Sequence, residues 1–183
     1  MTRIRGEAGA VAALVMTPIV AAAPAVAVES TESTESTHCV VETRPMAELE
    51  RGVPTEARCY PTVTELLRAN GLAGAAEGAV SIDEAQRRFA AAGYLAYHHV
   101  DANAGGISLA VSGSCDGSGI ASLPAGFNDQ ISSTRHLLCG RIKHFADANA
   151  AGDHQITSAG YNAVVNMNGQ LNDRVSSTYY YET

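Results

Sequence analysis

The chain has 183 residues, the size of a single domain, and its 19 acidic and 12 basic residues give a net charge of −7 at pH 7. This acidic balance argues against nucleic acid and anionic membrane surfaces as partners, because phosphate binding needs a basic face. It is compatible with divalent cations, although acidity in secreted proteins often serves only solubility.

The N-terminus has the features of a secretory signal. Two arginines precede an uncharged Ala/Val-rich run over residues 8–28, and residues 25–27 form an A-x-A cleavage site. A membrane anchor is the alternative, because the run is about long enough to span a bilayer. The run is mostly Ala and contains two prolines, so we expect a signal peptide at 1–27 and a secreted, extracellular protein.

Cleavage changes the charge and leaves a polar leader. It removes two basic residues and one acidic residue, so that 10 basic and 18 acidic residues remain with a net charge of −8. Glu-Ser-Thr is then repeated three times within residues 28–38. A segment of this composition has nothing to bury, so we expect a disordered leader. We expect neither a nucleic-acid partner nor a membrane contact after cleavage.

The exported chain contains four cysteines, Cys39, Cys59, Cys115 and Cys139. An even number in an exported protein indicates two disulfides, and four cysteines allow three pairings. We favour the local pairs Cys39–Cys59 and Cys115–Cys139, because each pair brackets one compositional unit. A zinc site is the alternative, but the sequence has no C-x-x-C and no close Cys/His pairing.

Residues 39–92 are expected to form a small helical extension stapled by its disulfide. A short helix is predicted over 64–69, ending at Asn70-Gly71, which is a plausible C-cap. A second helix is predicted after the capping-box pattern Ser81-x-x-Glu84. The extension has too few large apolar residues for a core of its own, so we expect it to pack on the domain that follows.

Residues 94–183 have the pattern of an antiparallel β-domain. Short β-type runs broken by Gly and Asn occur throughout this segment. Such runs are typical of a sandwich or a barrel.

Two phrases occur twice in this segment, in the same order. Residues 101–106 read D-A-N-A-G-G and residues 147–152 read D-A-N-A-A-G. Residues 128–133 read N-D-Q-I-S-S and residues 172–177 read N-D-R-V-S-S. The second phrase begins 27 positions after the first in one copy and 25 positions after it in the other. This indicates a duplicated unit of a little over forty residues, with copies at about 94–137 and 138–182.

Both phrases are rich in the hard oxygen donors that calcium prefers. The opening of D-x-N-x-x-G is like an EF-hand loop, but the twelfth position is Ser112 or Ser158 where an EF-hand needs Glu, so we reject that reading. The alternative is that the phrases are only turn chemistry, since Asp, Asn, Ser and Gly cap turns through their own backbone. Two matched copies favour calcium.

The duplicated N-D-x-x-S-S phrase resembles the Asn/Asp–Asn/Asp–x–x–Ser/Thr–Ser motif of the microbial calcium-binding βγ-crystallins. D-x-N-x-x-G resembles the folded hairpin of the same Greek-key unit. The resemblance implies a mainly β fold, a double Greek-key sandwich, and two calcium ions, each between the loop of one motif and the hairpin of the other. It implies carbonyl ligands from Gln130 and Arg174, hydroxyl ligands from Ser132 and Ser176, loop residues that shape or ligate (Asn128, Asp129, Asn172, Asp173), and hairpin ligands at or beside Asp101 and Asp147. Ser133 and Ser177 are expected to hold the loops.

The sequence departs from the family pattern in the hairpins. Ala104 and Ala150 stand where the family usually has an aromatic residue, whereas both hairpin glycines are present. Two other functions remain open for the fold. One is inhibition of an extracellular metallopeptidase, although the cysteine-proline-glycine phrase associated with that group is absent. The other is a crystallin-fold antimicrobial toxin.

An enzymatic reading depends on the histidines, chiefly His98, His99, His136, His144 and His154. Neighbours in a strand point to opposite faces, so His98 and His99 are poorly placed to ligate one metal. The sequence has no G-x-S-x-G elbow, no H-E-x-x-H and no phosphate-binding Gly loop. We therefore interpret the histidines as surface or half-buried residues and the protein as a non-enzyme.

Overall fold

The computed structural model describes residues 38–51, 55–74 and 80–182. The expected signal peptide (1–27), and the expected leader except for His38, lie outside these residues. The elements in chain order are β1 (His38–Glu42), α1 (Met46–Leu49), β2 (Ala57–Tyr60), α2 (Val63–Ala69), α3 (Ile82–Ala91), β3 (Ala96–Asp101), the 3-10 turn η1 (Ala102–Ala104), β4 (Gly105–Ser112), β5 (Asp116–Ile120), β6 (Ser133–His136), β7 (Arg141–Asp147), β8 (Ala151–Ser158), β9 (Val164–Asn166) and β10 (Ser177–Tyr181). Within the described ranges, no helix has the length and apolar character needed to cross a membrane.

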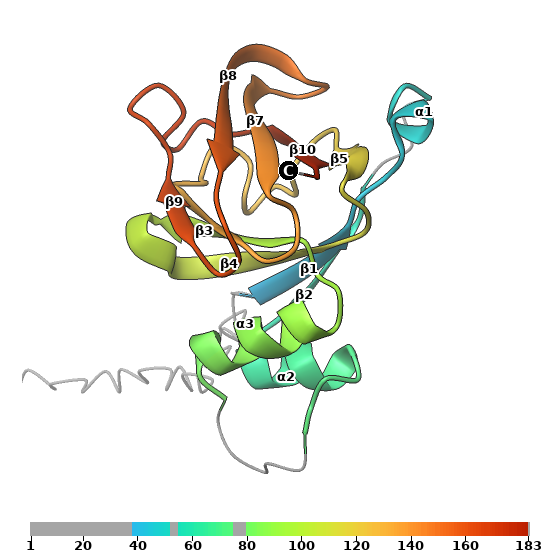
Figure 1. Ribbon diagram of the computed structural model, residues 1–183, viewed down its shortest axis with the longest axis vertical. Coiled ribbons are helices and arrows are strands. Elements are labelled where there is room, and N and C mark those ends of the chain that lie inside the picture. Colours follow the sequence, from blue (N-terminus) through green and yellow to red (C-terminus); the bar gives the residue numbers. More distant parts are fainter. Residues whose placement is uncertain (1–37, 52–54, 75–79, 183) are drawn as a thin grey trace, which may run out of the picture. The chain divides into compact units, whose positions relative to one another are not determined.

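The strands form two sheets that residues 94–137 and 138–182, the first and second units, share. One sheet has the order β2-β1-β4-β3-β6-β9 and the other has the order β5-β10-β7-β8 (Figure 1). The first unit supplies β3 to β6 and the second supplies β7 to β10. The third strand of each unit lies in the sheet of the other, because β5 pairs with β10 and β9 pairs with β6. The expected mainly β, double Greek-key sandwich is confirmed.

The N-terminal extension contributes strands as well as helices. β1 pairs in parallel with β4 and antiparallel with β2, so it widens the sheet of the first unit. The sequence of this segment predicted only helices. A five-residue strand carries little periodic signal, and its partner β4 lies far along the chain. Cys39 lies opposite Cys59 in the β1–β2 register, and the structure has the expected disulfides Cys39–Cys59 and Cys115–Cys139.

Both predicted helices form, and each begins at a side-chain cap. Thr62 Oγ1 accepts a hydrogen bond from the Glu65 backbone N–H at 3.2 Å, which starts α2. Ser81 Oγ accepts one from the Glu84 N–H at 3.2 Å, which starts α3. These bonds satisfy donors that a helix N-terminus otherwise leaves unpaired. α2 ends before Gly71, whose φ of +71° suits a glycine after a helix.

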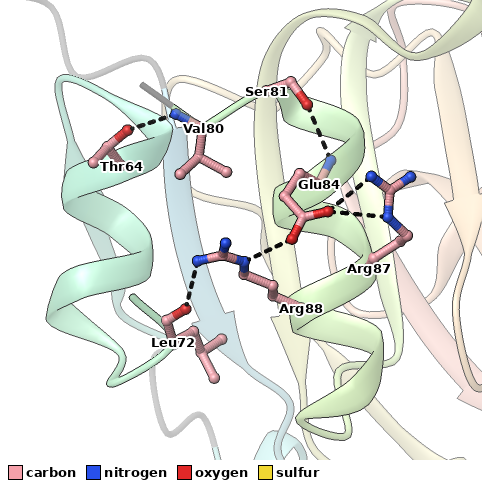
Figure 2. Close-up of polar contacts among 7 residues, drawn as sticks. All are labelled: Thr64, Leu72, Val80, Ser81, Glu84, Arg87 and Arg88. Carbon is pink, nitrogen blue, oxygen red and sulfur yellow. Dashed lines mark hydrogen bonds and ion pairs between the residues drawn. The ribbon is translucent and has the colours of Figure 1, made fainter. Parts of the chain in front are cut away.

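A polar network ties α3 to the segment after α2 (Figure 2). The Glu84 carboxylate accepts hydrogen bonds from Arg87 and Arg88, with N–O distances of 2.7 and 2.9 Å. Arg88 also donates to the Leu72 carbonyl at 3.3 Å. Beside it, the Val80 N–H donates to Thr64 Oγ1 at 3.2 Å. Both ends of the α2–α3 connection are therefore held.

Two apolar clusters lie on opposite faces of the six-stranded sheet. β1 serves both, since Val41 belongs to the cluster between the sheets and Val40 to the cluster under the helices. In Figure 1, α2 and α3 lie against the side of β1 and β4 that faces away from β7 and β8. Side chains alternate along a strand, which explains why adjacent valines enter different clusters. The extension is thereby joined to the domain by buried apolar surface.

Candidate metal sites

The two N-D-x-x-S-S loops have the same backbone conformation. The backbones of Asp129 and Asp173 adopt the left-handed conformation, with φ of 56° and 55°. Asp tolerates this region better than most residues, because its short polar side chain can hydrogen-bond locally. Asn128 donates to the Asp129 carboxylate at 2.9 Å, and Asn172 donates to that of Asp173 at 2.8 Å. The N-D pair therefore shapes each loop.

The loops of the two units cross and exchange hydrogen bonds. Ser132 Oγ donates to Asp173 Oδ1 at 2.5 Å, and we call this pair the first crossing. Ser176 Oγ donates to Asp129 Oδ1 at 3.0 Å, which is the second crossing. The backbones repeat the exchange, because the Asp129 N–H bonds the Val175 carbonyl and the Asp173 N–H bonds the Ile131 carbonyl. Each crossing thus joins a hydroxyl of one unit to a carboxylate of the other.

The second serine of each loop binds a hairpin. Ser133 Oγ donates to the Asp101 carbonyl at 2.6 Å and accepts from the Ala104 N–H at 3.0 Å. Ser177 Oγ makes the same two bonds to Asp147 and Ala150, at 2.7 and 3.2 Å. These two hydroxyls are therefore engaged with the hairpins rather than with the crossings.

The second serines bind the hairpins of their own units. Ser133 and Ser177 were expected to hold the loops, and each hydroxyl does so through the hairpin of its own unit. The reason is the strand register. Ser133 lies opposite His99 in the β6–β3 pair and Ser177 lies opposite Phe145 in the β10–β7 pair, close to where each hairpin begins. The first serines of the loops, by contrast, bond the loop of the other unit. The implied position of each ion, between the loop of one unit and the hairpin of the other, stays a prediction.

The hairpin aspartates lie over the hairpin glycines. A Cβ placed on Gly106, which has φ +70°, would lie 2.6 Å from Asp101 Oδ2, and Gly152 stands in the same relation to Asp147. The Asp101 and Asp147 carboxylates are exposed. Neither carboxylate bonds to the serines of the crossings among the described residues, so the structure does not bring these side chains into the crossings.

Gln130 and Arg174 were expected to act through their carbonyls. Neither carbonyl accepts a hydrogen bond from any residue that the structure describes. The Arg174 side chain turns away and donates to the Gln170 carbonyl at 3.0 Å. Both residues are exposed, so their carbonyl oxygens remain free acceptors at the outer ends of the loops.

The donor set of a crossing suits a hard cation. No cluster of three or more His, Cys, Asp or Glu side chains is placed to bind a metal in the described part of the chain. Each crossing instead offers one carboxylate and one hydroxyl, and two residues before each serine in the sequence stands a carbonyl, of Gln130 or Arg174, that accepts no hydrogen bond from the described residues. Such mixed oxygen donors fit calcium, which accepts all three, and do not fit a structural zinc site built from Cys and His.

One hairpin partner was not foreseen from the sequence. Asn166 in β9 accepts from the Asn103 N–H at 2.8 Å and donates to the Asn103 side chain at 3.0 Å. It thereby connects the second unit to the hairpin of the first. No repeated motif contains Asn166, so the sequence carries no signal for this contact.

Comparisons with known proteins found solved structures to which the chain is similar. Neither a protein-family profile nor a curated protein sequence matches the chain. A βγ-crystallin domain from Clostridium beijerinckii is 16% identical and covers 49% of this chain and 99% of its own length, with a TM-score of 0.39. One from Flavobacterium johnsoniae is 24% identical, covers 46% of this chain and 91% of its own, and has a TM-score of 0.36. A βγ-crystallin from Ciona intestinalis is 22% identical, covers 48% and 98%, and has a TM-score of 0.35.

The strand order decides the fold. Two four-stranded Greek keys packed as a sandwich are the arrangement that the sequence resemblance implied, and the structure adds that each key places its third strand in the sheet of the other. The domain has a βγ-crystallin-like fold. The crystallin-like domain carries its two N-D-x-x-S-S loops at equivalent places in the two units, each directly before the last strand of its unit, β6 or β10.

Four of the five histidines of the crystallin-like domain lie in its interior, which corrects the expectation of surface or half-buried positions, and only His154 is exposed. His98, His99, His136 and His144 are all at most 1% exposed. His98 and His99 do point to opposite faces, since His98 contacts Tyr180 of the other sheet and His99 contacts Gln86 of α3. A polar residue in a strand is usually on the surface, and burial here depends on hydrogen-bond partners that the sequence does not reveal.

Proposed function

We propose that the crystallin-like domain is a secreted, non-enzymatic calcium-binding module with one ion at each crossing. The observation that carries this proposal is the reciprocal pairing of Ser132 with Asp173 and of Ser176 with Asp129. Bare turn chemistry requires each loop only to bond its own backbone. It does not require each loop to direct its carboxylate at the hydroxyl of the other.

Charge and exposure support a cation at the crossings. Asp129 and Asp173 are exposed, and neither makes an ion pair with a basic residue in the described ranges. Arg174, which is next to Asp173, pairs with Asp153 instead. Each carboxylate is therefore available to a cation from solution, and the free Gln130 and Arg174 carbonyls add neutral oxygen ligands.

The chain's own residues connect ion binding to stability. When bound, calcium would supply a positive charge that attracts oxygens of both units at once. Ser132 and Ser176 supply hydroxyls from loops whose second serines already hold the hairpins. Because the complete ligand set exists only when the units are associated, binding favours the folded form. Mass action then gives about 2.7 kcal/mol at a hundredfold excess of free ion over Kd, for each site.

Export and the absence of catalysis are parts of the same proposal. Two disulfides are typical of an oxidising, extracellular compartment and agree with the signal peptide expected at 1–27. The buried histidines bond to threonine, tyrosine, glutamine and backbone groups of the core. Placed in this way they serve packing, and a general base needs access to substrate.

Calorimetric calcium titration of the exported chain tests the proposal. We expect about two ions to bind. Because the crossings pair residues from different units, Ser132→Ala and Asp173→Asn should remove the same site, whereas Ser176→Ala and Asp129→Asn should remove the other. The Ser132→Ala/Asp173→Asn double variant should therefore retain one ion, whereas Ser132→Ala/Asp129→Asn should retain none.

The matched control is Asp83→Asn, which removes an exposed carboxylate on α3 that pairs with Arg135 and not with a residue of the crossings. It should leave both sites intact. Binding heats that are equal in the two double variants, or no heat and no thermal shift in the unmodified protein, would overturn the proposal. In that case the loops are turns only.

A further inference from the structure

The duplication places a histidine of each unit at the centre of the sandwich. His98 lies three residues before the first D-x-N phrase, and His144 lies three residues before the second. Each pairs in register with the threonine that follows a Ser-Ser pair, Thr134 or Thr178. The two imidazole rings meet edge to face, with centroids 5.6 Å apart. One ring from each unit therefore lies at the interface between the Greek keys.

Both rings are wholly buried and bonded to neutral groups. His98 bonds Thr134 Oγ1 through Nδ1 at 2.8 Å and the Tyr180 hydroxyl through Nε2 at 2.6 Å. His144 bonds Thr157 Oγ1 through Nε2 at 3.0 Å. His144 Nδ1 has no partner in the described part of the chain. A second proton on His144 would therefore place an N–H donor in the core with no acceptor.

The groups around the pair offer no compensating negative charge. Tyr180 faces His98 from β10, and burial raises the pKa of its hydroxyl, so it stays neutral. His136 of β6 shares Thr157 with His144, at 3.0 Å. His99 lies on the other face of β3. No carboxylate in the described ranges forms an ion pair or hydrogen bond with His98, His136 or His144.

Burial accordingly disfavours the charged imidazoles. Desolvation, followed by the neighbouring His144, holds the pKa of His98 well below its ordinary value of 6.5. Desolvation and then His136 lower the pKa of His144 to about 3. Desolvation also lowers the pKa of His136. Opening the sandwich would expose all three rings to water, where an imidazole takes up a proton near neutrality.

We propose that the facing His98–His144 pair makes the association of the two Greek keys acid-labile, so that mild acid opens the sandwich and dismantles both crossings. The calcium-release part rests on the proposed function, and the acid-lability part does not. Each crossing draws its serine from one unit and its aspartate from the other. Separation of the units therefore removes both sites together, and by linkage bound calcium opposes the opening.

The direction of the pH effect follows from proton binding. Between pH 6.5 and about 3, unfolded His144 binds a proton that folded His144 does not. Stability therefore falls as the pH falls through 6.5 and goes on falling until the folded ring also titrates. His98, lowered in the same direction, adds a second proton. Two protons taken up on unfolding raise the unfolding constant about 100-fold for each unit of pH lowered near pH 5.

Urea unfolding of the exported chain between pH 7 and pH 5 tests this inference, first in chelator. The unmodified protein should lose stability steeply towards pH 5. In the His98→Gln/His144→Gln variant, the two protons are no longer taken up on unfolding. For each unit of pH lowered near pH 5, the unfolding constant of this variant should therefore rise by a factor about 100 times smaller than in the unmodified protein. The control is His154→Gln, which removes the exposed histidine of β8 and should keep the full slope. Equal slopes in the double variant and the unmodified protein would overturn the proposal.

A second measurement covers the case in which the double variant does not fold. Histidine ring signals of the unmodified protein are followed by NMR from pH 7.5 to 4.5. His98 and His144 should stay neutral while the protein remains folded. Titration of either ring near pH 6.5 in the folded state would contradict the proposed acid lability. A steep slope in chelator with no added stability from calcium would leave the acid lability standing and reject the calcium function. If calcium added stability but the double variant and the unmodified protein had equal slopes, the calcium function would stand and the acid lability would be rejected.

Discussion

At the scale of single residues, the same side chains serve turn chemistry and oxygen donation. Asp129 and Asp173 hold left-handed conformations, and each also directs a carboxylate oxygen at a serine of the other unit. Their asparagine neighbours shape the loops through hydrogen bonds to the same carboxylates. The turn interpretation and the calcium interpretation therefore describe one structure, and only ion binding separates them.

The hairpin glycines should tolerate no side chain. Gly152 has φ +73°, and an added Cβ would collide with the Asp147 carboxylate. We expect Gly152→Ala to lower the free energy of unfolding by about 1–2 kcal/mol, measured by urea denaturation, because a left-handed conformation is costly for alanine. Gly160→Ala is the control, since a Cβ there meets open space. A loss no larger than that of the control would contradict the collision.

The second serine of each loop should act on stability. Ser133→Ala removes the bonds to the Asp101 carbonyl and the Ala104 N–H. We expect a loss of about 1–2 kcal/mol in chemical unfolding without calcium, because two hairpin groups lose their partner. Ser158→Ala, on the exposed side of β8, is the matched control and should change stability by less than about 0.5 kcal/mol. Equal stability of the two variants would show that the hairpin does not need Ser133.

At the scale of elements, short sequence patterns predicted the two helices and the starts of two strands, because these features depend on neighbouring residues. The capping-box pattern at Ser81 predicted where α3 begins, and Asn70-Gly71 predicted where α2 ends. The Ser-Ser pairs mark where β6 and β10 begin. β1 and β2 were not predicted, because β1 pairs with β4 across about seventy residues of chain, and no periodicity within five residues reveals such a partner.

The residues of the candidate site were likewise predicted from the sequence, whereas their pairing was not. The motif identified Asp129, Ser132, Asp173 and Ser176 from sequence, because each lies within a six-residue phrase. Which aspartate meets which serine depends on the crossing of two loops about forty residues apart, so the pairing emerges only from the strand order. The buried histidines were misjudged for a related reason. Tyr180, the partner of His98, and Thr157, the partner of His136, come from the other sheet.

At the scale of the whole molecule, the extension and the two Greek keys share their apolar interior. The cluster between the sheets contains Val41 of β1 together with residues of both units, such as Leu109 and Ile142. The cluster under the helices joins Phe89 of α3 to Tyr97 of β3 and Ala110 of β4. β3 and β4 thus carry the hairpin of the first unit on one end and the helices on one face.

This shared interior predicts that a cavity in the extension destabilises the whole described unit. Phe89 is completely buried, and its ring lies 4.4 Å from that of Tyr94 and 5.5 Å from that of Tyr97, between centroids. Phe89→Ala removes these contacts and should lower the free energy of unfolding by about 3–5 kcal/mol, because the surroundings collapse only partly into the space. Far-UV circular dichroism and tyrosine fluorescence, followed together in urea, should report one coincident transition at a lower midpoint.

The control for this variant lies on the same helix. Arg87 is exposed and makes a surface ion pair with Glu84, so Arg87→Ala should cost less than about 1 kcal/mol. If Phe89→Ala instead produced two separate transitions, with the β-domain unfolding at its original midpoint, the extension would be an independent appendage. A single shifted transition would mean that α3 and β1 stabilise the six-stranded sheet. The same sheet positions His98, the hairpin at Asp101 and the first crossing, because all of these depend on β3 and its neighbours.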